Sequence, residues 1–128
     1  MIPTAIEVVT LFVEDIAAAK AFYQRVFALE IVYEDDVSAV LAFSGAMVNL
    51  LAVSEAPPLV APRPIAPSAA GAGMLLTIRV PSVDAAVKEL EAAGVPLLNG
   101  PIDRPWGRRT AAFADPSGHV WEIAEVIA

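Results

Sequence analysis

The 128-residue chain can bury one hydrophobic core, and although 57% of it is hydrophobic, no stretch is long and uninterrupted enough to span a membrane. Its net charge of -7 argues against nucleic acid as a partner and favours the approach of a cationic small molecule. The absence of cysteine excludes disulfides and thiolate metal sites, and with no secretion signal we expect a cytoplasmic protein.

The first half of the chain predicts a strand, a helix and three further strands. Residues 6–15 are rich in β-branched side chains, which indicates a strand, and Asp15 is placed to cap the helix that follows. The helix has apolar side chains at helical spacing: Ile16, Ala19, Tyr23, Val26 and Phe27. The three later strand-like runs cover residues 30–35, 38–43 and 47–53.

Residues 55–73 contain five prolines and two glycines, a composition that predicts a linker. The order of elements then repeats. A strand at 74–80 precedes a helix capped by Ser82 and ended by Gly94 and Pro96. Strand-like runs follow at 95–98, 108–114 and 119–126, with residues 99–107 expected to form a loop.

The two halves match in detail as well as in order. "SGAMVNLLAV" (44–53) aligns without a gap with "SGHVWEIAEV" (117–126), so that Asn49 corresponds to Glu122. The predicted fold is therefore α+β, a single domain 1–128 made of two tandem βαβββ modules, 4–54 and 74–127, that form a curved mixed sheet around a cleft. Each helix covers one sheet face, and the other faces line the cleft.

The alternation of side chains along a strand assigns residues to the cleft. If Glu122 faces it, then so do Val120 and Ala124, while Trp121 and Ile123 face the helix. The same period groups other residues on one face of each first strand: Val8, Thr10 and Phe12, and then Leu75, Thr77 and Arg79.

The chain resembles the vicinal oxygen chelate superfamily, which includes glyoxalase I, extradiol dioxygenases and bleomycin resistance proteins. The resembling stretches are "VVTLFVEDIAAAKAFYQRVFAL", "IRVPSVDAAVKELEAAGV" and "PWGRRTAAFADPSGHVWEIAE", the last with the Asp-Pro-x-Gly turn typical of the superfamily. The resemblance implies the paired βαβββ fold, a small-molecule ligand and a homodimer.

In metal-dependent members of this superfamily, four side chains from the first and fourth strands of both modules bind one divalent ion. The corresponding residues here are Val8, Asn49, Leu75 and Glu122. One carboxylate and one amide are too few donors for a hard cation, so we expect no metal cofactor. A bulge that turns Glu7 inward is the one route by which a divalent ion remains possible.

Several candidate residues have both a functional and a structural interpretation. Glu122 is a candidate general base or ligand contact, or else is satisfied by an internal hydrogen bond or by Arg79. Arg79 is a ligand anchor or extends to solvent. Trp106 stacks a planar ligand with Arg108 or Arg109 nearby, or the loop is structural and Arg109 pairs with an acid such as Asp115.

The sequence thus favours a metal-free protein that binds a small aromatic or cationic molecule in the cleft, as antibiotic-sequestering members do. The alternative is a lyase, isomerase or dioxygenase of the glyoxalase type that uses Glu122 with or without a divalent metal. A third interpretation is a module whose main role is association with itself or another protein.

Overall fold

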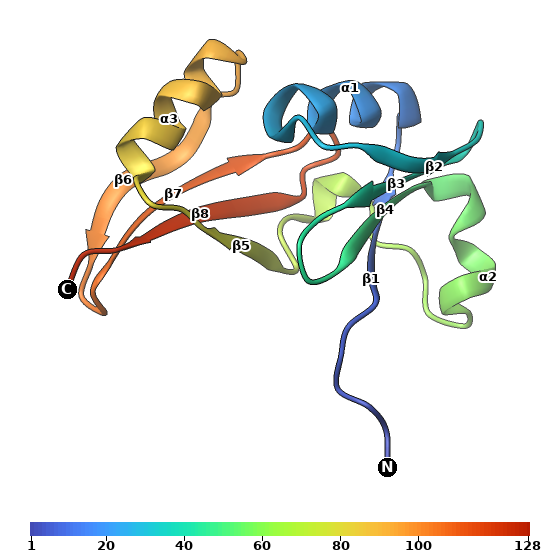
Figure 1. Ribbon diagram of the computed structural model, residues 1–128. Helices are drawn as coiled ribbons and strands as arrows, with labels where there is room; N and C mark the ends of the chain where they lie inside the picture. Colours follow the sequence, from blue (N-terminus) through green and yellow to red (C-terminus); the bar gives the residue numbers. More distant parts are fainter. The chain divides into compact units, whose positions relative to one another are not determined.

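The computed structural model describes residues 1–128 and divides into two compact units, Met1–Pro67 and Ser68–Ala128. Figure 1 shows the elements of each unit. The boundary between the units falls within residues 55–73, the segment predicted to be a linker. Each unit contains one four-stranded mixed sheet, so the predicted α+β class with two βαβββ modules is confirmed.

The first unit has the strand order β1-β4-β3-β2, with β1 parallel to β4 and the other neighbours antiparallel. Helix α1 covers one face of this sheet (Figure 1). The elements are β1 (Val8–Val13), α1 (Ile16–Phe27), β2 (Ile31–Glu34), β3 (Ser38–Ala42) and β4 (Met47–Ala52).

Helix α1 begins as predicted, because the Asp15 side chain accepts a hydrogen bond from the Ala18 N–H at 3.0 Å. It ends at Ala28, whose backbone adopts the left-handed conformation. The helix buries Ala19, Phe22 and Tyr23 against the sheet, so Phe22 belongs to the core although the sequence pattern did not assign it there.

Three short helical turns that the sequence did not predict lie at the start of the proline-rich segment and within it: η1 (Val53–Glu55), α2 (Pro57–Val60) and η2 (Ser68–Ala70). Proline fixes the backbone dihedral φ near its helical value and is therefore well suited to the first turn of a helix. Pro57 and Pro58 occupy those positions in α2. None of the three turns buries a side chain.

The second unit repeats the arrangement in the order β5-β8-β7-β6, with β5 parallel to β8. Its elements are β5 (Leu75–Arg79), α3 (Val83–Ala92), β6 (Leu97–Arg104), β7 (Arg108–Ala114) and β8 (Val120–Val126). Ser82 caps α3 as predicted, accepting from the Ala85 N–H at 3.1 Å. Glu125 of β8 adds a second cap, accepting from the Val83 N–H at 2.8 Å.

The expected loop at residues 99–107 is wrong, because most of it extends β6 to Arg104 and only a tight turn separates β6 from β7. The register between these strands shifts twice between Leu97 and Ile102, which accommodates the Asn-Gly-Pro sequence without ending the strand. The hairpin therefore brings residues of this segment onto the sheet.

In each unit the helix covers one face of the sheet. The opposite face is the open face, which includes Thr10 and Asn49 in the first unit and Thr77 and Glu122 in the second. Leu11, Val13 and Leu50 are buried on the helix face of the first sheet, and Phe113, Trp121 and Ile123 on that of the second. No helix in the structure is long and apolar enough to cross a membrane.

Candidate functional site

The open face of the first sheet carries four of the predicted ligand-binding residues: Val8, Thr10, Phe12 and Asn49. Thr10 of β1 lies beside Asn49 of β4, which lies beside Val40 of β3. Val8 exposes 40% of its surface, whereas Phe12 is half-buried. The strand residues of this face include no charged side chain.

The Asn49 side chain has an unusual environment. Its Oδ1 atom is buried and has no hydrogen-bond partner. A buried acceptor without a partner destabilises a folded protein by about 1–3 kcal/mol, so such atoms are uncommon in native proteins. Asn49 thus offers an acceptor that the chain itself does not satisfy.

The open face of the second sheet carries Leu75, Thr77, Arg79 and Glu122. Thr77 lies directly beside Glu122 in the register of β5 and β8. The Thr77 hydroxyl donates a hydrogen bond of 3.0 Å to Oε1 of Glu122. Of the alternatives that the sequence left open for Glu122, the structure therefore contains the internal hydrogen bond and no ion pair with Arg79.

The four positions that correspond to metal ligands supply one carboxylate, one amide and two hydrocarbon side chains, which does not fit a divalent ion. The register of β1 and β4 is regular from Val8 to Val13, so no bulge turns Glu7 onto the open face. His119 precedes β8, and its Nδ1 lies 2.8 Å from Asp115 Oδ2. The structure contains no group of three or more His, Asp or Glu side chains arranged so that they could hold a metal ion.

Trp106 is 68% exposed in the turn between β6 and β7. The turn is closed by a hydrogen bond from the Gly107 N–H to the Arg104 carbonyl, at 3.1 Å. An indole so exposed contributes little to a core, and its flat face is accessible to a planar molecule. Arg104 and Arg108 flank this turn on the two strands.

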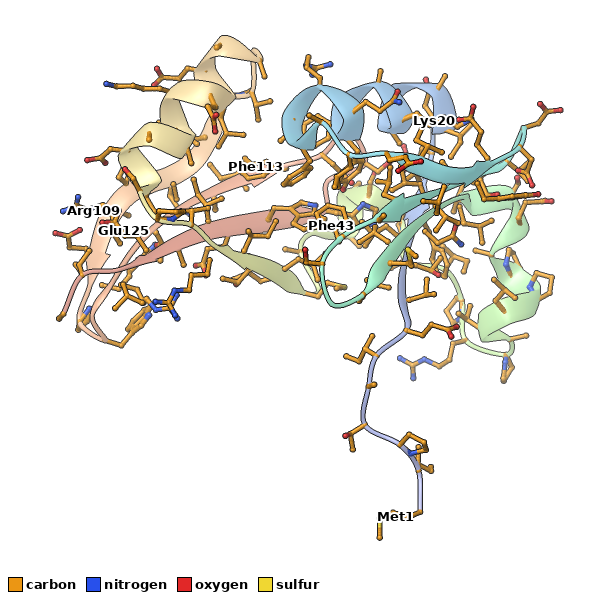
Figure 2. All side chains as sticks on the ribbon, viewed as in Figure 1. Met1, Lys20, Phe43, Arg109, Phe113 and Glu125 are labelled. Carbon is orange, nitrogen blue, oxygen red and sulfur yellow. The ribbon has the colours of Figure 1, made fainter.

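Arg109 lies apart from the other candidates, on the helix face of its sheet. Its guanidinium binds Asp103 with N–O distances of 2.6 and 3.2 Å and Asp84 of α3 at 3.4 Å. Figure 2 shows it near Glu125, close to the start of α3. The bond from Arg109 lowers the pKa of Asp103, and the two aspartates raise that of Arg109.

The suggested partner of Arg109, Asp115, is wrong. Asp115 is buried in the turn before β8, where it accepts from the Ser117 and His119 N–H groups, both at 2.9 Å. Arg109 and the core residue Phe113 are four residues apart in β7, so their side chains point to the same face of the sheet. The alternation of side chains along the strand therefore already places Arg109 on the helix face.

Sequence reasoning considered Arg108 only as a neighbour of Trp106, and it missed Arg104 on the open face altogether. Arg104 was assigned to a loop, and its position became interpretable only with the register of β6. Arg108, Thr110 and Ala112 alternate along β7 and share one face, and Thr110 and Ala112 lie beside Ala124 and Glu122 of β8. The same alternation could therefore have assigned Arg108 to the open face.

The fold is shared with many solved structures. A glyoxalase/bleomycin resistance protein/dioxygenase from Nocardioides superposes with a TM-score of 0.81 at 21% identity, covering 99% of this chain and 86% of that one. A lactoylglutathione lyase from Agrobacterium tumefaciens gives 0.77 at 27% identity, covering 96% and 94%. TnmS3, an antibiotic-binding protein from Streptomyces sp. CB03234, gives 0.73 at 25% identity, covering 98% of each chain.

No curated protein sequence matched the chain significantly. The family model of the Glyoxalase/Bleomycin resistance protein/Dioxygenase superfamily, by contrast, matches residues 5–123, nearly the entire chain. The repeated βαβββ order and the Asp-Pro-Ser-Gly turn before β8 agree with that match. This chain belongs to the glyoxalase/bleomycin resistance protein/dioxygenase superfamily.

Proposed function

We propose that this protein binds a small planar molecule on the open face of a sheet without the help of a metal ion. The observation that carries the proposal is the presence of Val8 and Leu75, both exposed, at positions where metal-dependent relatives have ligands. The similarity to an antibiotic-binding protein supports a binding role for this fold.

The chemistry of these positions suits an organic ligand. Val8 and Leu75 expose 40% and 49% of their surfaces, and covering apolar surface contributes about 25 cal/mol per Å². Trp106 adds an exposed aromatic surface for stacking.

Tryptophan fluorescence tests the binding proposal, because the chain has one exposed and one buried tryptophan, Trp106 and Trp121. We expect planar aromatic compounds to quench the emission of Trp106 and to raise the melting temperature. In the Trp106→Phe variant the remaining emission, from Trp121, should not respond. A panel of such compounds that neither quenches nor stabilises the wild-type protein would contradict the proposal.

Metal analysis tests the other half of the proposal. Protein purified without chelator and dialysed against Zn²⁺, Ni²⁺ or Mn²⁺ should retain far less than one ion per chain. The Glu122→Gln variant is the control, because it removes the carboxylate from the four positions. A stoichiometric ion in wild type that is lost in Glu122→Gln would show that the protein is a metalloprotein.

A second candidate function is acid–base catalysis by Glu122. The Thr77 hydroxyl orients its carboxylate, and a lactoylglutathione lyase is among the similar structures. Spectrophotometric assay of S-lactoylglutathione formation and breakdown tests this candidate. Turnover by wild type that is abolished in Glu122→Gln would place catalysis above binding alone.

A further inference from the structure

Three arginines share the open face of the second sheet: Arg79 on β5, Arg104 on β6 and Arg108 on β7. Arg104 and Arg108 are direct neighbours across the β6–β7 hairpin. Arg79 lies beside Ala124, which in turn lies beside Thr110, two residues along β7 from Arg108. Neighbouring strands are about 4.8 Å apart, so Arg79 and Arg104 lie on edge strands about 14 Å apart, with Arg108 between them. Arginine side chains extending from both edges can span that distance to one anionic group.

These arginines lack the carboxylate partners that Lys20 and Arg109 have. Lys20 pairs with Glu34, and Arg109 pairs with Asp103 and Asp84. The side chains of Arg79 and Arg108, in contrast, form no ion pair or hydrogen bond. The open face of this sheet carries a single carboxylate, Glu122, which already accepts from Thr77.

Arg104 is held in place by neutral acceptors. Its Nε donates to Thr110 Oγ1 at 3.0 Å, and its Nη2 donates to Asn99 Oδ1 at 3.3 Å. A guanidinium has five N–H donors, so these two bonds fix its plane and leave its remaining donors for another acceptor. Neutral partners leave the positive charge of Arg104 uncompensated.

The sheet also has room beside this cluster. An open hollow of about 460 Å³ lies at the end of β5 and β8 and is lined by Arg79, Val80, Pro81, Glu125 and Val126. Glu125 uses Oε1 to accept from the Val83 N–H and makes no ion pair with Arg79. Near the other side of the cluster, Trp106 lies in the turn that joins Arg104 to Arg108.

We infer that the open face of the second sheet binds the anionic group of a small aromatic ligand: a carboxylate, sulfonate or phosphate contacted by Arg79, Arg104 and Arg108. The inference rests on the proposed binding function and specifies its ligand. It reverses the expectation from the net charge of -7, because the local charge of this face has the opposite sign. Arginine forks bind such oxyanions with charge-assisted hydrogen bonds.

Two fluorescent probes with one aromatic framework test the inference: 8-anilinonaphthalene-1-sulfonate, an anion, and N-phenyl-1-naphthylamine, which is neutral. Wild-type protein should bind the sulfonate more tightly, with an affinity that falls as salt is added. Arg79→Gln and Arg108→Gln should each weaken sulfonate binding by about 5- to 10-fold and leave the neutral probe unchanged. Lys88→Gln, which removes an exposed cation from α3, is the matched control and should change neither.

The outcomes separate this inference from the proposed function. Equal affinity for both probes, or equal loss of sulfonate binding in Lys88→Gln, overturns the anion site while leaving small-molecule binding intact. Binding of neither probe contradicts the proposed function itself. Circular dichroism and melting temperature of each variant establish that the substitutions act on binding and not on folding.

Discussion

Asn49 and Glu122 occupy equivalent positions in the two units, yet only one of them is satisfied. Each lies beside a threonine of the neighbouring parallel strand, Thr10 or Thr77. Thr77 donates to Glu122, whereas the Asn49 oxygen is buried without any donor. Because the backbone register is the same, the difference arises from the side chains and not from the fold.

The unsatisfied oxygen predicts that Asn49→Leu stabilises the protein. Leucine has a similar volume and removes the buried acceptor, so we expect the free energy of unfolding to rise by about 1 kcal/mol. Asn99→Leu is the control, because Asn99 Oδ1 accepts from Arg104 and its loss should not stabilise. Urea unfolding measures both, and a destabilised Asn49→Leu would show that Asn49 has a structural partner.

Asp35 predicts a specific pH dependence of stability. Its carboxylate accepts from the Val37 N–H, the Ser38 hydroxyl and the Tyr33 hydroxyl, all at 2.9 Å. These hydrogen bonds lower the pKa of Asp35 below its ordinary 3.8, and the bond from the Val37 N–H has the largest effect. A lowered folded-state pKa gives stability that is complete above the unfolded pKa and is lost as pH falls through the folded value.

The Asp35→Asn variant should therefore lose less stability than wild type between pH 5 and pH 2. Glu55→Gln, which removes an exposed carboxylate of η1, is the control and should follow the wild-type profile. Melting temperatures across this range measure the effect. A profile of Asp35→Asn parallel to that of wild type would contradict a role for these hydrogen bonds.

At the scale of elements, the sequence predicted both main helices and their first residues, because Asp15 and Ser82 have a local chemical role as caps. It failed for β6, whose Asn-Gly-Pro segment has the composition of a loop. Pairing with β7 along the hairpin overrides that local preference, and such pairing is not visible in the composition of one strand. Arg104, the open-face arginine of β6, escaped notice for the same reason.

Gly100 in β6 is the residue whose small size this pairing requires. Its φ is +91°, and a Cβ there would lie 2.4 Å from the Thr110 carbonyl oxygen and 2.7 Å from the Ala111 Cα. We expect Gly100→Ala to destabilise the protein by about 1–3 kcal/mol more than the positive φ alone would cost. Chemical denaturation measures the difference.

Gly45→Ala isolates the cost of the dihedral, because Gly45 has a φ of +88° and nothing within 4 Å of the added methyl group. The two substitutions thus share the backbone strain and differ in the clash with β7. Equal losses of stability in both variants would mean that β7 can move away from Gly100 at little cost.

At the scale of the whole chain, the repeat made the architecture predictable, since each half has the same order of elements and joins neighbours in sequence through short connections. The candidate site was less predictable. Alternation assigned Thr10, Asn49, Thr77 and Glu122 to the open faces, but hydrogen bonds between side chains depend on register and rotamer. The hydrogen bond to Glu122 and the unsatisfied Asn49 therefore emerged only from the structure.

We expect the protein to form a homodimer. β1 and β5 are edge strands of their sheets and carry exposed apolar side chains, and such edges favour association. Salt should strengthen the dimer by screening the repulsion between chains of net charge -7. The mass measured by sedimentation velocity at low and high salt should approach twice the 13.4 kDa chain mass.

Two variants test which surface forms the dimer. Ile6→Glu, just before β1, should dissociate it, whereas Leu59→Glu on α2 should not, although both side chains are 67% exposed. A monomer at every salt concentration, or dissociation by both substitutions, would contradict association through the edge strands.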